Sequence, residues 1–100
     1  MVEPTLEDMY REVERHIQNN WLGGCLGFKY KEIDGTDTIV PTGSLEGTIK
    51  LLFKSQIGGN AIKSGRDIII IEFIENDPRL RHRKVVELRS ILVSFFNRYR

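Results

Sequence analysis

A short stretch near the end of the chain holds the side chains with the clearest capacity for chemistry. Residues 76–84 read N-D-P-R-L-R-H-R-K and place four cations within six positions. Guanidinium and ammonium groups crowded in this way can hold the phosphates of a nucleic acid. The Gly-rich segment of residues 55–66 adds two more cations. The sequence therefore predicts a nucleic-acid-binding site, on RNA more readily than on DNA, made of Lys63, Arg66, Arg79, Arg81, Arg83 and Lys84.

The local sequence predicts how these cations are displayed. Asp77 is a good helix cap and Pro78 suits a first helical turn. A helix that begins here would present the cations at its positive end, where free N–H groups also attract anions. Cations at that end destabilise a helix by a few tenths of a kcal/mol each. A chain that tolerates four of them is therefore expected to use them.

The same predicted helix carries a second candidate surface. Val85, Leu88 and Leu92 follow helical spacing and form a core-facing stripe. The apolar arc is wider than one contact with a sheet requires, which favours self-association or a protein partner. We expect a homodimer or a heteromeric complex whose interface contains Val86, Val93, Phe95 and Phe96. The alternative function is thus a protein-interaction or assembly subunit, in which the arginines serve solubility.

Metal and nucleophile chemistry find little support in the residue types. His16 and His82 lie far apart in the chain, and Cys25 is the single cysteine, so no disulfide and no Cys/His metal site is predicted. No serine lies in the spacing of a nucleophile elbow. We expect a non-enzymatic protein with no catalytic residue, no metal and no cofactor.

One minor enzymatic alternative is a Mg²⁺-dependent nuclease. Asp67 and Glu72 fall on one predicted strand near Lys63, and paired acids there could hold the ion. The pattern is similar to the PD-(D/E)xK nucleases. The acid-x-Lys of that family is missing, because Ile74 stands where the lysine should be.

The elements that must position these residues can be read from periodicity. A helix is predicted over residues 5–21, capped by Thr5, and a half-buried strand over residues 25–33. A short strand or extended link is expected at residues 38–40, and alternation resumes from Ser44 to Lys54 as a further strand. Asp67 to Glu75 is a covered, isoleucine-rich strand.

This order predicts one α+β domain spanning residues 1–100. It consists of a helix, a three- or four-stranded antiparallel meander and a second helix, with both helices on one face of the sheet. The order resembles in topology the double-stranded RNA-binding domain. In that family, cations at the start of the second helix hold phosphates across a groove, a place that Arg79, Arg81, Arg83 and Lys84 would take here.

Composition and charge agree with an ordinary globular domain. The 100 residues are 40% hydrophobic and 29% charged, with a formal net charge of +1. The charge is unevenly spread: the first fifty residues hold five Lys/Arg and nine Asp/Glu, and the last fifty hold ten and five. This split favours an anionic partner for the basic half, or an acidic first helix packed beside a basic last one. We expect an intracellular protein, cytoplasmic or nuclear, with no signal peptide or transmembrane segment and with a viral or phage origin left open.

Overall fold

The computed structural model describes residues 5–54, 67–74 and 81–98. Within them the chain forms a helix, two strands, a second helix, two more strands and a last helix. Their bounds are α1 Leu6–Asn20, β1 Leu26–Lys31, β2 Asp37–Gly43, α2 Leu45–Phe53, β3 Ile69–Phe73, β4 His82–Glu87 and α4 Leu88–Asn97.

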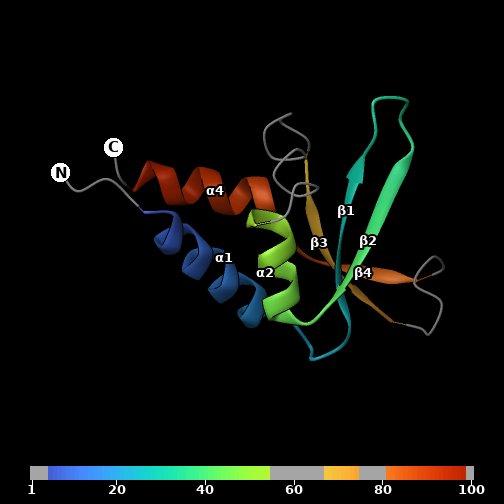
Figure 1. Ribbon diagram of the computed structural model, residues 1–100, viewed down its shortest axis with the longest axis horizontal. Coiled ribbons are helices and arrows are strands. Elements are labelled where there is room, and N and C mark those ends of the chain that lie inside the picture. Colours follow the sequence, from blue (N-terminus) through green and yellow to red (C-terminus); the bar gives the residue numbers. More distant parts are fainter. Residues whose placement is uncertain (1–4, 55–66, 75–80, 99–100) are drawn as a thin grey trace.

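The four strands form one antiparallel sheet in the order β2-β1-β3-β4, so β1 and β3 are central and β2 and β4 are the edges. The three helices lie on one side of this sheet (Figure 1). The α+β class, the antiparallel sheet and the placement of the helices on one face are therefore confirmed. The strand order is not a simple meander, because the chain passes from the edge strand β2 to the central strand β3.

The first helix forms as its sequence predicts. Thr5 Oγ1 accepts a hydrogen bond from the Asp8 N–H at 3.1 Å, and Asp8 Oδ2 accepts from the Thr5 N–H at 3.0 Å, which makes a complete capping box. These hydrogen bonds, first that of the Thr5 backbone, hold the pKa of Asp8 below its ordinary value. The helix ends at Asn20, and Gly23 follows in a positive-φ conformation that a side chain would resist.

The segment after Ser44 is a helix, so the predicted strand from Ser44 to Lys54 is wrong. The Ser44 side chain accepts from the Gly47 N–H at 3.0 Å and caps α2. Thr48, Ile49 and Leu52 are the buried residues of α2, and their spacing belongs to a helix. Because Leu45 and Ile49 are four residues apart, they satisfy a strand period and a helix period equally, which explains the error.

The predicted start of the last helix is also wrong. Residues 82–87 form β4, and α4 begins only at Leu88. The consecutive β-branched residues Val85 and Val86 are buried, and Val86 pairs with Ile70 of β3. Burial of the isoleucine strand against a partner strand outweighs the helical pattern. The cations Arg83 and Lys84 therefore lie on a strand, and the likeness to the double-stranded RNA-binding domain fails, since that domain places them on a helix.

One hydrophobic cluster joins the helices to the sheet. Its centre on β1 is Leu26, Phe28 and Tyr30, whose predicted alternation toward one face is confirmed. Tyr10 of α1 packs on Phe53 of α2 with ring centroids 4.7 Å apart. The remaining buried members come from every other helix and strand except β2 and include Val13, Ile17, Ile49, Leu52, Ile70, Val86, Leu88 and Ile91.

An ion pair between Glu12 and Arg98 joins α1 to the end of α4. Glu12 Oε1 accepts from Arg98 at 2.6 Å and from Arg15 at 2.8 Å, and it contacts His16 Nε2 at 3.1 Å. The Arg98 hydrogen bond is the main reason that the pKa of Glu12 falls from 4.5 to about 2. Because the folded pKa lies below the unfolded value, the ionised carboxylate stabilises the fold above that value. This contribution is lost as the pH falls through 4.5 toward about 2.

We predict that Glu12→Gln lowers the free energy of unfolding by about 1–2 kcal/mol at neutral pH. The deficit relative to the wild type should shrink as the pH falls toward the folded pKa of Glu12. Urea denaturation at a series of pH values measures both effects. Glu7→Gln is the control, because the Glu7–Arg11 pair is exposed and should contribute no more than about 0.5 kcal/mol. A deficit that does not depend on pH would contradict this role of Glu12.

Candidate functional site

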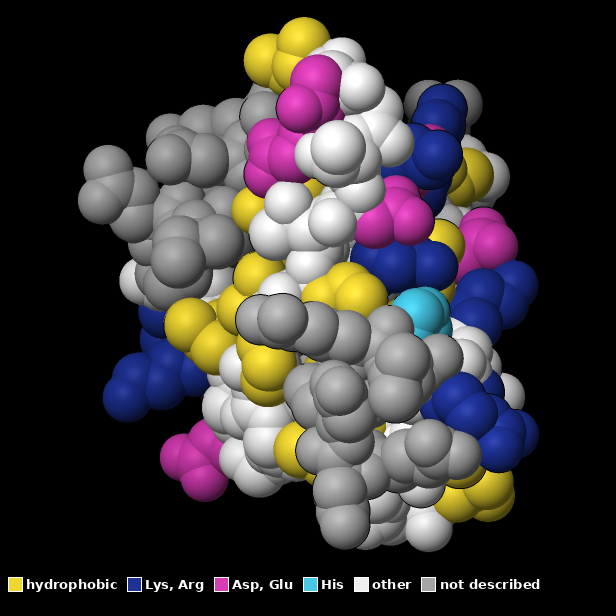
Figure 2. Space-filling model, turned by 90° about the vertical axis from the view of Figure 1, so that its right-hand side faces the viewer, with side chains coloured by type: hydrophobic (Ala, Val, Ile, Leu, Met, Phe, Trp, Pro, Cys, Tyr) yellow, Lys and Arg dark blue, Asp and Glu magenta, His cyan; other side chains and the backbone are white. Residues whose placement is uncertain are grey.

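The sheet has one face packed on the helices and one face turned away from them. Alternation along β1 sends Phe28 and Tyr30 to the helices and Lys29 and Lys31 to the other side. The strand register places residues of the neighbouring strands beside them. We call this second side the open face, and it comprises Gly27, Lys29, Lys31, Asp37, Ile39, Pro41, Ile69, Ile71, Phe73, His82, Lys84 and Glu87. Figure 2 shows Lys and Arg side chains on this side of the molecule, interspersed with Asp and Glu side chains and close to a histidine and to hydrophobic side chains.

An aromatic ring lies on the open face at the end where β1 begins and β3 ends. A Cβ atom at Gly27 would lie 2.9 Å from Phe73 Cζ, which is closer than side chains tolerate, so the Phe73 ring rests directly on the backbone of β1. The Val40 carbonyl oxygen of β2 would lie nearer still, 2.8 Å from that Cβ atom, so position 27 requires glycine. Phe73 is half-buried, and His82 is its register partner on β4. Two planar rings thus lie side by side on neighbouring strands.

A lysine lies against this histidine. Lys29 Nζ is 3.4 Å from His82 Nε2. An ammonium group can only donate, so this contact makes Nε2 the acceptor and leaves the proton on Nδ1. Within the described part of the chain, Nδ1 is buried and has no hydrogen-bond partner. Lys29 is half-buried, and in residues 5–54, 67–74 and 81–98 no carboxylate forms an ion pair with it. A half-buried cation that has no carboxylate partner favours the binding of an anion, which would neutralise its charge.

The cations predicted as a phosphate site are separated by the fold. Lys84 lies on the open face, is exposed, and pairs with Glu87 at 3.0 Å. The Lys84 hydrogen bond is the main cause that lowers the pKa of Glu87. Arg81 is exposed and directly precedes β4. Arg83 points to the helix side of the sheet. Lys63, Arg66 and Arg79 lie outside the described residues.

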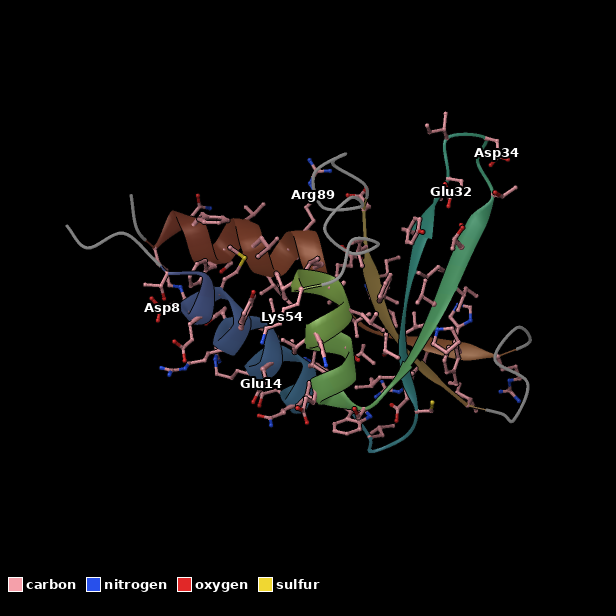
Figure 3. The ribbon with its side chains drawn as sticks, in the orientation of Figure 1. Asp8, Glu14, Glu32, Asp34, Lys54 and Arg89 are labelled. Carbon is pink, nitrogen blue, oxygen red and sulfur yellow. The ribbon has the colours of Figure 1, made fainter. Side chains whose placement is uncertain are left out.

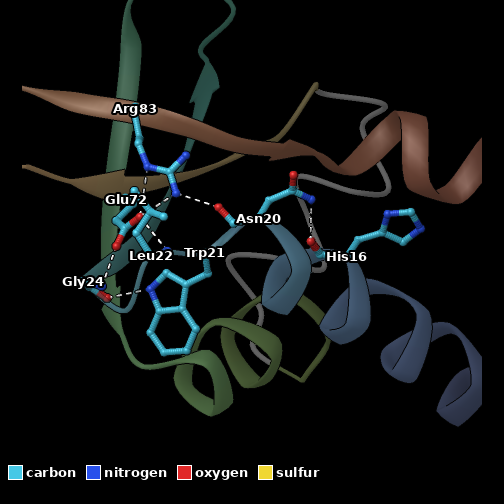
Figure 4. Close-up of polar contacts among 7 residues, drawn as sticks. All are labelled: His16, Asn20, Trp21, Leu22, Gly24, Glu72 and Arg83. Atoms are coloured by element: carbon cyan, nitrogen blue, oxygen red, sulfur yellow. Dashed lines mark hydrogen bonds and ion pairs between the residues drawn. The ribbon is translucent and has the colours of Figure 1, made fainter.

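Arg83 is part of a buried polar network (Figure 4). Its Nε donates to Glu72 Oε1 at 3.0 Å, and its Nη2 lies 2.8 Å from the same oxygen and 2.6 Å from the Asn20 carbonyl. Glu72 also accepts from the Leu22 N–H at 3.2 Å and from the Gly24 N–H, so both of its oxygens are engaged. Glu72 is 4% exposed. Arg83 therefore holds the turn after α1, on the side of the sheet opposite Lys84.

The paired acids of the nuclease alternative are not brought together. Asp67 is exposed and pairs with Arg89 of α4 at 3.3 Å, whereas Glu72 lies at the other end of β3, about 16 Å along a strand of that length. In the part of the chain that the structure describes, no group of three His, Cys, Asp or Glu side chains could hold a metal ion.

The predicted interface divides into buried and exposed residues. Val86 is 9% exposed and Phe95 is 2% exposed, and both are core residues, so neither is free to contact a partner. Val93 and Phe96 are 52% and 44% exposed and lie three residues apart on the outer side of α4. The broad arc expected from the sequence shrinks to these two positions because α4 starts ten residues later than predicted.

Sequence reasoning missed Lys29, Phe73 and His82 as a group. The alternation in residues 25–33 does place Lys29 opposite the core. Its proximity to His82 depends on the pairing of β1 with β3 and of β3 with β4, which brings together residues 53 positions apart.

Comparison with known proteins does not extend this picture: no protein-family model, no curated protein and no solved structure matches the chain. None of the described helices combines the length and the apolar character that crossing a lipid bilayer requires.

The geometry predicts different roles for two neighbouring cations. Arg83→Ala leaves the Glu72 carboxylate buried without its guanidinium, so we expect the free energy of unfolding to fall by about 3 kcal/mol. Lys84→Ala removes an exposed pair and should change it by no more than about 0.5 kcal/mol. Urea denaturation of both variants measures the difference. Equal stability of the two would show that Arg83 is not structural.

Proposed function

We propose that the protein binds nucleic acid through the open face of its sheet. The observation that carries this proposal is the half-buried Lys29 ammonium beside the His82 ring, which has Phe73 as its register partner. Among the described residues no carboxylate forms an ion pair with Lys29. A nucleic acid offers both complements of such a surface, because its phosphates are anions and its bases are flat apolar rings.

Neighbouring charges support the same location. Lys31 continues β1 beyond Lys29, and Lys84 lies across β3 from β1 on the same face. Arg81 is exposed at the start of β4. These cations differ from those predicted at a helix start, because here they come from β1 and β4, the strands on either side of β3. An extended phosphate backbone can contact charges spread in this way, whereas a single small anion would reach only one or two.

The test is a titration of labelled RNA and DNA oligonucleotides, single- and double-stranded, at two salt concentrations. We expect the double variant Lys29→Gln/Lys84→Gln to bind at least tenfold more weakly than the wild type at low salt. Its salt dependence should be shallower by about 1.5 in log–log slope, since two phosphate contacts are lost. Fluorescence anisotropy measures both quantities.

The matched control removes the same charge from the other side of the molecule. Lys50 lies on α2 and Lys54 caps the C-terminus of that helix, and Figure 3 places Lys54 near Glu14, away from the strands. Lys50→Gln/Lys54→Gln should retain wild-type binding. If no oligonucleotide binds at low salt, or if both double variants lose affinity equally, the open face is not a nucleic-acid site.

A second candidate function is assembly with a protein through α4. The exposed Val93 and Phe96 lie one turn apart on this helix, where they form a small apolar patch. Phe96 is supported from beneath by Phe95, whose ring meets it edge-on at 5.4 Å. A second copy of the chain is the simplest partner for such a patch.

We predict that a dimer formed through α4 dissociates in Val93→Glu/Phe96→Glu, because two carboxylates would be buried at the contact. Light scattering across a range of protein concentrations gives the mass. Ser94→Glu is the control, since Ser94 is exposed on the same helix and lies about 100° around it from Val93. A wild type that remains monomeric at the highest concentration would remove self-association and leave only a different protein as partner.

A further inference from the structure

The open face has the features of a stacking surface rather than of a purely ionic one. Phe73 lies across Gly27, where the missing side chain of the glycine lets the ring approach the backbone of β1. The ring is held by the strand beneath it, yet the residue is only half-buried. An aromatic ring in this position can receive another flat ring at its exposed part.

His82 extends this surface across the strand pair. It is opposite Phe73 in the register of β3 and β4, so both side chains leave the same face of the sheet. Ile39 of β2 and Ile69 of β3 are the register partners of Lys29 and add apolar area to the open face. Together these residues form an aromatic and apolar surface. Ionic contacts with a phosphate backbone alone would not require such a surface.

The position of Lys29 relates the rings to a cation. Its ammonium lies 3.4 Å from the His82 ring and on the same face as Phe73. His82 links this ammonium to Phe73, because the two ring-bearing residues are a cross-strand pair whose Cβ atoms lie about 5 Å apart. A base on the rings would therefore place its own phosphate within reach of Lys29.

We propose that the open face binds single-stranded nucleic acid, with a base stacked on Phe73 and His82 and the adjacent phosphate held by Lys29. This inference rests on the proposed nucleic-acid binding and specifies its ligand. In a duplex the bases are stacked on one another and paired, so their faces are closed to an aromatic side chain. Single strands expose them, and stacking then adds affinity with little dependence on the base sequence.

Three ligands of equal length separate stacking from charge: a labelled single strand, the same sequence as a duplex, and an abasic single strand that keeps every phosphate. For the wild type we expect the intact single strand to bind at least tenfold more tightly than the other two. The abasic strand removes bases without changing the protein, so this comparison does not depend on the folding of any variant.

Two substitutions test the ring itself. Phe73→Leu should weaken binding to the intact single strand roughly tenfold and leave binding to the abasic strand unchanged. Phe73→Tyr keeps the ring and should bind as the wild type does. Circular dichroism and thermal melting establish that both variants are folded.

The possible outcomes distinguish this inference from the proposal beneath it. If duplex, abasic and intact strands bind equally and Lys29→Gln/Lys84→Gln weakens all three, nucleic-acid binding stands and stacking is overturned. Equal affinity of folded Phe73→Leu and wild type for the intact strand also overturns stacking. If none of the three ligands binds at low salt, both the inference and the proposed function fail.

Discussion

Glu72 extends from β3 to the end of α1, and the arrangement of the sheet depends on the hydrogen bonds and the ion pair that its carboxylate forms there. Its carboxylate accepts the N–H groups of Leu22 and Gly24 and pairs with Arg83 of β4. Arg83 in turn donates to the Asn20 carbonyl, one of the groups that a helix C-terminus leaves without a partner. The turn after α1, the central strand and the edge strand are thus joined at one point. A carboxylate with only 4% exposure is tolerable there because each oxygen has donors, and loss of the guanidinium would leave it undercompensated.

The pairing of arginines with carboxylates inside the fold also explains much of the uneven charge along the sequence. Among the described residues, Arg83, Arg89 and Arg98 of the basic half each pair with a carboxylate of the fold. The Arg98 pair with Glu12 is a contact between the acidic first helix and the basic last one. Excess arginine near the C-terminus is therefore weak evidence for an anionic partner. Lys29, from the acidic half, is the more informative cation, because its immediate surroundings are a histidine and two isoleucines.

The order of strands and helices also determines which face of the sheet is left uncovered by helices. All described helices cover one face of the sheet (Figure 1), so residues that alternate away from them collect on the other. Phe73 and His82 meet there because Arg83 and Glu72 point the opposite way. The position of the structural ion pair thus sets the position of the candidate binding surface through the two-residue period of a strand.

Several features follow from local sequence alone. The capping box of Thr5 and Asp8, the alternation of Leu26, Phe28 and Tyr30 and the covered isoleucine strand are all predicted correctly. In each of them the local interaction and the burial favour the same conformation.

Two segments were decided by tertiary contacts. Residues 45–53 carry apolar spacings that suit either period, and burial of Thr48, Ile49 and Leu52 against the core selects the helix. Residues 82–87 follow good helix-start signals, yet they pair with β3, because an isoleucine strand needs a partner on each side. The candidate site depends on this second outcome. Lys29, Phe73 and His82 have no shared local pattern, and only strand pairing over long sequence separations places them together.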